Sequence, residues 1–431
     1  MKFRYAIYVV VLSMLTTFSL SAQQHPETHA PAAHTDSTHQ MPTTTGAHTD
    51  AHLTTGAHAE HGCFPHKEEK GYNSTETILN HIANANEFHI FGHYSIPLPC
   101  FLYSKEDGLT NMSSSVFNHG ATAVNRYVSD HGTTKRIVGD FPAGKVPLTV
   151  VHGDHYVYHD SLENGFVCYQ NKVYPIEKAS GLLSATSFYD FSITKNVATM
   201  LIASLLLFLM FTTAAKAYTT RKGMAPTGIQ NLLEPMVVFI RDEVAKPMIG
   251  AKYERFLPYL LTIFFFILAN NLIGLVPMPF AGMGANVTGN IATTAALALI
   301  ALIVTTLNGK ADYWKHIFWM PGVPVPMKIF LAPIELLGVF TKPISLMIRL
   351  FANITAGHII ILALVGLIFV FGKAGESVAG AGAGVVVGGL FTLFLSVIEL
   401  IVAFIQAFIF TILTASYIGS AVEEHHHDEA H

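Results

Sequence analysis

Long apolar stretches in the second half of the sequence constrain its fold more than any other feature. Residues 197–215, 256–277 and 285–307 contain no charged side chain. Each is close to the length of about 20 residues that a helix needs to cross the hydrocarbon core of a membrane. Two longer apolar stretches follow, at about 327–371 and 390–422. The pattern predicts an all-α polytopic membrane region with about five transmembrane helices.

The polar residues are concentrated in the first half of the chain. Only 13% of the 431 residues are charged, against about 25% in a typical soluble protein, and the mean hydropathy is +0.42. Residues 23–195 are polar and residues 196–422 mostly apolar, apart from 229–249, where apolar and charged positions alternate at helical spacing. That spacing predicts an amphipathic helix on the cytoplasmic surface of the membrane. The formal net charge of −4 gives no reason to expect a nucleic-acid partner.

The N-terminus has the pattern of an export signal. Basic Lys2 and Arg4 precede an apolar run that ends at the small residues Ser21 and Ala22. We therefore predict a signal peptide over residues 1–22, with a retained membrane anchor as the alternative. In either case the residues that follow are expected on the exported side.

A histidine-rich arm is predicted over residues 23–69. Residues 23–66 are of low complexity, contain nine histidines and repeat the motif TTGAH. Such a segment cannot bury a core and is expected to be disordered. Histidine-rich tracts also bind zinc, copper or nickel, so an accessory metal role is the alternative.

Residues 70–192 predict a small β-rich exported domain, because aromatic and β-branched stretches alternate there with Gly, Asn, Asp and Ser turns. We read His152, His155 and His159 as strand and turn residues rather than as metal ligands. The three cysteines of the chain all belong to the exported part, where an oxidising compartment permits a disulfide. Connectivity does not follow from sequence; our working hypothesis pairs Cys100 with Cys168 and leaves Cys63 free.

The distribution of basic residues predicts the orientation. Segments 216–256 and 309–328 hold ten Lys and Arg, whereas the loops at 278–284 and 372–377 hold only Lys373. The positive-inside rule therefore places the two basic segments in the cytoplasm. With five spans, the His-rich tail at 423–431 is also cytoplasmic.

The last two spans are predicted to form an antiparallel hairpin around a Gly-rich turn at 375–389. In such a hairpin, residues at equal depth have position numbers with a constant sum. The sum is 755 for Arg349 with Gln406 and 757 for His358 with Glu399. The polar residues thus form two layers, about 13 Å apart along the helix axis.

The polar residues of the fourth span also share a face. One broad stripe at spacings of three and four contains Glu335, Lys342, Ser345, Arg349 and Asn353. His358 is turned about 180° from Arg349 on an ideal helix. An arginine at the bilayer centre costs about 2.5–3.5 kcal/mol, so Arg349 is interpreted as functional.

A structural role is an alternative for the remaining polar residues. Lys342 and Glu335 can extend to water at the interface, and Gln406 and Asn353 can join helices by hydrogen bonds. A buried acid and a buried histidine at one level are typical of a proton relay; a structural pair is the alternative.

Three motifs carry a resemblance to a known family. The stretches KPISLMIRLFANITAGH, IELIVAFIQAFIFTILTASYI and NNLIGLVP resemble subunit a of the F-type ATP synthase membrane sector. The resemblance extends over about 190–422, and we delimit the membrane domain as 193–422. It implies proton translocation that is coupled to ATP synthesis. It also implies a c-ring, b-stalk subunits, the rest of the synthase and membrane lipid as partners.

The resemblance implies a role for each matched residue. Arg349 is similar to the family's stator arginine, which faces the c-ring, with Gln406 and Asn353 as its polar companions. His358 and Glu399 match the pair that lines the half-channel from the exported side. Glu335 on the cytoplasmic route and Asn290 on the intake route complete the path. Ser345 and Lys342 lie beside it.

Two positions depart from the family pattern. In a well-known version of the family the acid lies on the first helix of the pair and the histidine on the second, so His358 and Glu399 are exchanged here. Asn290 stands where many relatives have an acid. The exported extension has no counterpart in the common core.

The resemblance implies a non-catalytic subunit in a bacterial inner membrane. The sequence contains no Gly-rich phosphate loop, so we expect no nucleotide site and no cofactor. The coupled ion, H⁺ or Na⁺, and the ring size depend on another subunit. A secondary ion or metal transporter with a His-rich exported arm is the alternative function, and it would predict internal repeats and broken helices; a purely structural scaffold would leave Arg349 without a purpose.

Overall fold

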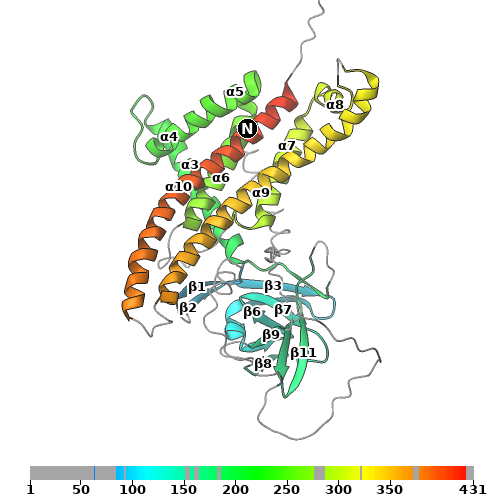
Figure 1. Ribbon diagram of the computed structural model, residues 1–431, viewed down its shortest axis with the longest axis vertical. Coiled ribbons are helices and arrows are strands. Elements are labelled where there is room, and N and C mark those ends of the chain that lie inside the picture. Colours follow the sequence, from blue (N-terminus) through cyan, green and yellow to red (C-terminus); the bar gives the residue numbers. More distant parts are fainter. Residues whose placement is uncertain are drawn as a thin grey trace, which may run out of the picture.

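The computed structural model contains a β domain at one end of a bundle of tilted helices (Figure 1). The residues that the structure describes are 63, 84–91, 94–150, 156–159, 165–181, 186–275, 287–320, 323–371 and 378–423. The predicted signal peptide, most of the His-rich arm, His152, His155 and residues 424–431 of the C-terminal tail lie outside them. The predicted fold class, a small β-rich region followed by about five membrane helices, is confirmed.

Short strands that alternate with turns build the β domain. The strands are β1 (Glu87–Phe91), β2 (Tyr94–Pro97), β3 (Pro99–Ser104), β4 (Gly108–Ser113), β5 (Thr122–Val124), β6 (Tyr127–Asp130), β7 (Thr133–Ile137), β8 (Lys145–Pro147), β9 (Val157–His159), β10 (Gly165–Tyr169), β11 (Lys172–Glu177) and β12 (Phe188–Asp190), with one 3₁₀ helix, η1 (Ser114–Gly120). They form a seven-stranded sheet in the order β8-β5-β6-β7-β11-β10-β9, a three-stranded sheet β12-β3-β4 and the hairpin β1-β2. The pairs within each sheet are antiparallel.

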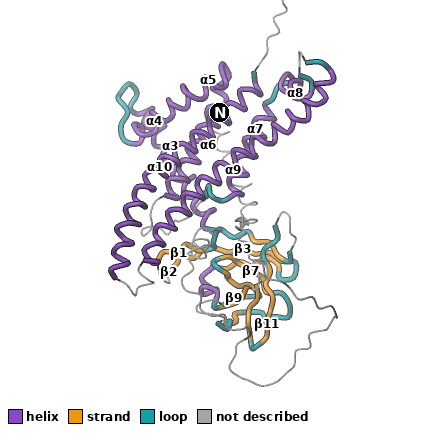
Figure 2. Tube along the Cα trace, in the orientation of Figure 1, coloured by secondary structure: helices purple, strands orange, loops and turns teal. Residues whose placement is uncertain are grey.

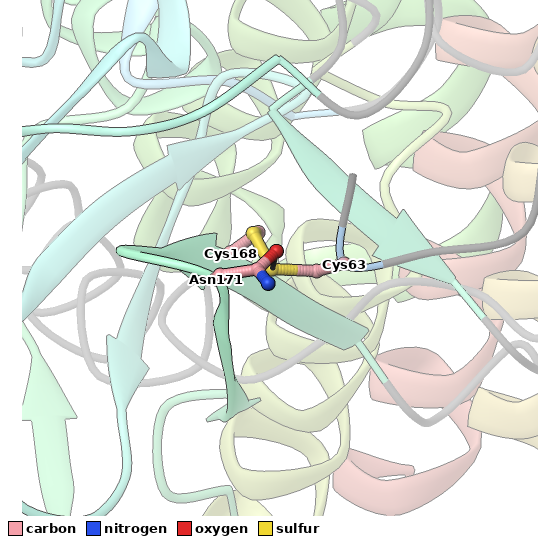
Figure 3. Close-up of a disulfide and its surroundings, with 3 residues drawn as sticks. All are labelled: Cys63, Cys168 and Asn171. Carbon is pink, nitrogen blue, oxygen red and sulfur yellow. Dashed lines mark hydrogen bonds between the residues drawn. A yellow bond between two sulfur atoms is a disulfide. The ribbon is translucent and has the colours of Figure 1, made fainter. Parts of the chain in front are cut away.

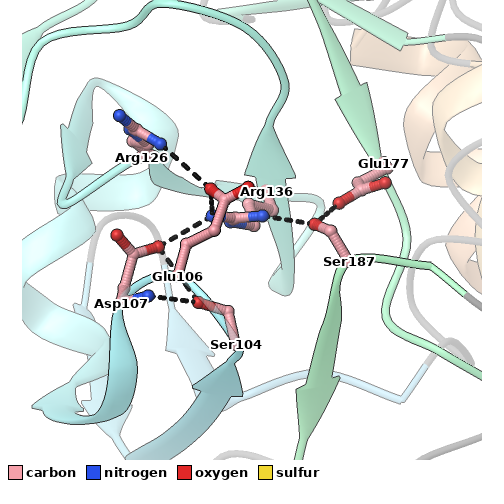
Figure 4. A network of polar contacts seen from close by, with 7 residues as sticks. All are labelled: Ser104, Glu106, Asp107, Arg126, Arg136, Glu177 and Ser187. Carbon is pink, nitrogen blue, oxygen red and sulfur yellow. Dashed lines mark hydrogen bonds and ion pairs between the residues drawn. The ribbon is translucent and has the colours of Figure 1, made fainter.

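An arginine network joins the two larger sheets (Figure 4). Arg136 on β7 has a side chain only 5% exposed, and its Nη2 lies 2.7 Å from Glu106 and 2.8 Å from Asp107 in the β3–β4 turn. Its Nη1 donates to Ser187, and the Ser187 hydroxyl donates to Glu177 on β11. Because a buried guanidinium needs partners for its charge, these contacts fix the relative position of the sheets.

The disulfide differs from our working hypothesis. Cys63 is bonded to Cys168 on β10, with Cα atoms 5.9 Å apart, beside Asn171 of the β10–β11 turn (Figure 3). Cys100 is the free cysteine, fully buried on β3 in the three-stranded sheet. The pairing of Cys100 with Cys168 was wrong because Cys100 lies on a strand of the three-stranded sheet and Cys168 on a strand of the seven-stranded sheet.

The second half of the chain is helical (Figure 2). The helices are α3 (Lys195–Thr220), α4 (Ile229–Phe239), the π-helix η2 (Ile240–Ala245), α5 (Lys246–Ile249), the 3₁₀ helix η3 (Gly250–Lys252), α6 (Tyr253–Leu275), α7 (Ile291–Asn308), α8 (Ala311–Phe318), α9 (Val325–Phe371) and α10 (Val378–Val422). In the part of the chain that the structure describes, five helical segments are long and apolar enough to cross a membrane: Lys195–Thr220, Ile229–Leu275, Ile291–Asn308, Val325–Gly366 and Gly382–Val422. The run from α4 to α5 lies at the end of the bundle far from the β domain (Figure 1).

The β domain is attached directly to the first of these helices. The backbone N–H of Lys195, the first residue of α3, donates to the carbonyl of Ala85 at 2.8 Å. The next N–H, of Asn196, donates to the side chain of Asn84 at 3.3 Å, and Ile193 donates to Pro99 O at 3.1 Å. These hydrogen bonds hold the N-terminus of α3 in place on the β domain.

Helices α9 and α10 form the predicted antiparallel hairpin and pack side by side (Figure 1). The predicted Gly-rich turn at 375–389 is too long, since α10 begins at Val378. Glycine is tolerated in membrane helices, because hydrocarbon offers the backbone no alternative hydrogen-bond partner. The connection is therefore confined to residues 372–377, which lie outside the described residues.

Candidate functional site

A histidine–glutamate pair lies between the two long helices. Nδ1 of His358 on α9 is 3.2 Å from Oε1 of Glu399 on α10. Their side chains are only 15% and 6% exposed. The juxtaposition that the hairpin arithmetic predicted is present, because the two residues lie at the same depth and on facing sides of the hairpin. The imidazole of His358, a group that can accept and donate protons, thus contacts a carboxylate away from bulk solvent.

Gly357 makes room for this carboxylate. A Cβ atom on Gly357 would lie 2.8 Å from Oε1 of Glu399 and 3.1 Å from its Cδ. Both distances are shorter than ordinary van der Waals contact, so a larger residue would displace the glutamate. The second oxygen, Oε2, is buried, and no described residue donates to it.

Arg349 lies on α9, nine residues before His358, and is half-buried. Among the described residues, none accepts a hydrogen bond from its guanidinium or forms an ion pair with it. Its charge acts on the Tyr417 phenol of α10, and the ammonium of Lys342 lies 5.5 Å from the centre of the same ring. Lys342 therefore lies over an aromatic ring of α10, and the charge of Arg349 acts on the hydroxyl of the same residue.

Gln406 occupies the level of Arg349 on the second helix but does not bind it. Its side chain is buried, with an exposed fraction of 6%. Within the described part of the hairpin, no hydrogen bond joins Gln406 to Arg349. Arg349 and Gln406 therefore lie at the same depth in the hairpin without a hydrogen bond between them.

The outer face of α9 beside Arg349 is open. Ser345, Ala352 and Asn353 are exposed, and so is Ile348, at 52%. The small side chains allow another helix to approach closely along this face. Large apolar residues are exposed on α10 as well, among them Leu390, Phe394, Leu400, Ile401 and Ile405.

Glu335 lies about four turns before Arg349 on α9, further from the His358 layer and towards the end of the hairpin that carries α8. It is half-buried and acts electrostatically on Tyr313 of α8. Burial, and then the carboxylate of Glu335, raise the pKa of Tyr313. Glu335 thus lies near α8.

Asn290 has a structural role at the start of α7. It is the N-cap, and its Oδ1 accepts a hydrogen bond of 2.9 Å from the N–H of Ala292. Beside it, the Thr355 hydroxyl of α9 donates to Gly289 O at 3.3 Å. Because Thr355 precedes His358 by one turn, the start of α7 lies near the histidine–glutamate pair.

A second buried polar contact was missed by the sequence reasoning. Asn271 of α6 donates to the Ala403 carbonyl of α10 at 3.1 Å and accepts from the Thr288 hydroxyl at 2.6 Å. Asn271 and Thr288 are 3% and 1% exposed. The signal was available in the motif NNLIGLVP, since two adjacent amides in an apolar helix need partners.

Comparisons with known proteins identify the family of the membrane region. A family model described as ATP synthase A chain matches residues 197–419, and one described as a domain of unknown function, DUF8433, matches residues 77–191. The protein called ATP synthase subunit a of Chloroherpeton thalassium is 47% identical to this chain over 253 residues. The match covers 56% of this chain and 71% of that protein. The corresponding protein of Pelodictyon phaeoclathratiforme is 43% identical over 246 residues, covering 56% and 68%. The chain is therefore a multi-pass membrane protein that belongs to the F-type ATP synthase subunit a family.

Proposed function

We propose that this chain conducts protons through two half-channels beside a ring of c subunits and so couples a proton gradient to ATP synthesis. The observation that carries the proposal is the buried contact between His358 and Glu399. Ionisable side chains in the interior of a membrane protein are costly and rare, and they typically mark paths for ions or protons. Together they form the intake relay from the exported side, with Asn290 at the nearby start of α7.

The relay delivers protons to the open face of α9. Arg349 lies nine residues from His358, which corresponds to about 13 Å along the helix. A ring carboxylate at that face accepts a proton from the relay, turns through lipid in the neutral form and returns to Arg349. The exposed Ser345, Ala352 and Asn353 leave space for ring helices on this side.

Arg349 separates the two half-channels. A guanidinium stays charged in proteins, so it attracts a ring carboxylate and favours its ionised form. The released proton leaves towards the cytoplasm past Lys342 and Glu335. Since the arginine does not pass the proton on, a direct leak between the channels is blocked.

The arrangement in the cell follows from the same reasoning. The β domain and the His-rich arm lie on the exported side of a bacterial inner membrane, and the segments around α4, α5 and α8 contact the cytoplasm. The c-ring and the b-stalk subunits are the protein partners.

Substitution of Arg349 by alanine tests the proposal. In inverted vesicles that contain the whole synthase, we expect Arg349→Ala to abolish ATP synthesis driven by an imposed proton gradient, while hydrolysis by the soluble sector persists. The matched control is Arg255→Ala, which removes an exposed arginine that donates to Asn308 outside the hairpin and should retain synthesis. Coupled synthesis by the Arg349→Ala enzyme would refute the stator role.

A further inference from the structure

Two histidines and an aspartate outside the membrane region converge at one edge of the β domain. Asp130 ends β6, His131 follows it in the turn to β7, and His159 ends β9. A possible ligand atom of each lies within 4.8 Å of those of the other two. Nothing in the proton path described above uses this cluster.

The cluster forms where the large sheet closes on itself. β6 and β9 are separated in the sheet by β7, β11 and β10, a distance of about 19 Å in a flat sheet with strands about 4.8 Å apart. Yet Nε2 of His159 lies 3.2 Å from Oδ1 of Asp130. The sheet therefore curls strongly, and a side-chain contact joins its two distant strands.

Both imidazoles direct Nε2 at the carboxylate of Asp130, and that of His159 lies 3.2 Å from each of the two carboxylate oxygens. Nε2 of His131 lies 3.8 Å from Oδ1 of Asp130, the oxygen that His159 also approaches. In a tetrahedral zinc site with bonds of about 2.0–2.2 Å, ligand atoms lie about 3.3–3.6 Å apart. The two nitrogen–oxygen separations of 3.2 and 3.8 Å bracket that spacing, and the imidazole nitrogens lie within 4.8 Å of each other.

The carboxylate is held as a metal ligand would be. The other oxygen of Asp130, Oδ2, lies 3.2 Å from the ammonium of Lys135, and the aspartate side chain is only 7% exposed. Ligating carboxylates are commonly fixed by a contact of this kind outside the ligand shell. The two histidine side chains are 31% and 34% exposed, so water can reach the open side of the cluster.

The turn that carries His131 is unusual for this residue. His131 and Gly132 have φ angles of 46° and 77°, as in a two-residue hairpin turn in which Asn-Gly or Asp-Gly is preferred. A side chain at Gly132 would collide with Ala85, at 2.7 Å, while Gly132 O accepts from Asn86 N at 2.7 Å. The turn is therefore fixed in place and holds the imidazole beside Asp130.

We propose that Asp130, His131 and His159 form a binding site for Zn²⁺, with one carboxylate oxygen, two imidazole nitrogens and water as ligands. This donor set suits a borderline-soft divalent ion. The site lies on the same sheet as Cys168, to which the end of the His-rich arm is joined through Cys63. It is thus a zinc site distinct from the arm itself.

Cobalt titration of the purified full-length chain in detergent tests the site, because Co²⁺ replaces Zn²⁺ and absorbs strongly in the visible region when its coordination is tetrahedral. We compare the wild-type protein with His131→Asn, and with the double variant His131→Asn/His159→Gln. Asparagine tolerates a positive φ, so the turn is preserved. The control is His119→Asn, since His119 also has a positive φ, 54°, and lies 3.5 Å from a carboxylate, Glu87, outside the cluster.

The wild-type and His119→Asn proteins are expected to show one equivalent of the strongly absorbing species, displaced by Zn²⁺. The double variant should not form this species. Its zinc affinity at this site should fall by more than about 100-fold, which exceeds the loss typical of a substitution outside the ligand shell. Protection of the buried Cys100 from thiol reagents verifies that each variant is folded. Equal spectra and stoichiometry in all four proteins would overturn the proposal and leave the cluster as an ion-pair network.

Discussion

Substitution of Gly357 by alanine separates the position of Glu399 from the presence of its charge. A new Cβ atom would lie 2.8 Å from Oε1, whereas ordinary contact begins at 3.4 Å. The carboxyl group must therefore move by about 0.6 Å. The contact with His358 is 3.2 Å long and ceases to be a good hydrogen bond beyond about 3.5 Å. Gly357→Ala thus breaks the pair without removing either member.

The expected effect on proton transfer is larger than the effect on stability. The obstructed atoms are the end of a flexible side chain, so the cost to folding should be near the lower end of overpacking, about 1 kcal/mol. A misplacement of about 1 Å in a reacting group can reduce a rate about 100-fold. For a shift of about 0.6 Å we expect at least about a tenfold loss of proton-driven ATP synthesis.

The assay compares proton-driven synthesis with hydrolysis in vesicles that contain the complete synthase. Gly338→Ala is the matched control, because it lies in the same helix and no atom lies within 4 Å of its new Cβ. We expect Gly338→Ala to synthesise ATP at the wild-type rate. Equal rates for Gly357→Ala and wild type, or equal losses in both variants, would refute the role assigned to the pair.

Three further predictions concern the histidine–glutamate pair and the three cysteines. The double exchange His358→Glu/Glu399→His should retain more proton-driven synthesis than either single change, measured in the same vesicles, because it restores the contact in reverse; equal loss in all three variants would contradict a paired function. In the β domain, burial and then Asp190 raise the pKa of the Cys100 thiol to about 11, so at pH 8 a thiol reagent should modify it only after unfolding. Peptide mapping without reduction should recover Cys63 joined to Cys168; labelling of Cys63 in the native protein would contradict the disulfide.

The membrane part of the fold was predictable because length and hydropathy act locally. A helix in hydrocarbon satisfies its own backbone, so a charge-free run such as 197–215 identifies α3 without reference to the rest of the chain. The pairing of His358 with Glu399 was also predictable, since an antiparallel hairpin fixes depth by simple addition. The start of α10 was not, because Gly-rich sequence indicates a turn in water but is compatible with helix in lipid.

Contacts between distant elements were beyond the sequence reasoning. The partner of Cys168 depends on which sheet each cysteine joins, and Cys63 and Cys168 are 105 residues apart. The approach of Asp130 to His159 likewise requires closure of a curled sheet. Neither spacing nor composition contains that information, so His159 was grouped with its sequence neighbours.

The distribution of burial along the hairpin gives a physical reason to expect a second protein beside it. In the segment Ile229–Leu275, 61% of the most apolar window is buried, against 11% in each of the hairpin segments of α9 and α10. Glu399 and Gln406 are nevertheless hidden between the helices, while Arg349 is only half-buried and Asn353 is exposed. If hydrocarbon alone covered that face, the guanidinium would cost about 2.5–3.5 kcal/mol with no described partner to offset it. In the function proposed above, a ring carboxylate at this depth offsets that cost, which favours this face of α9 over the apolar side of α10 as the side that faces the ring.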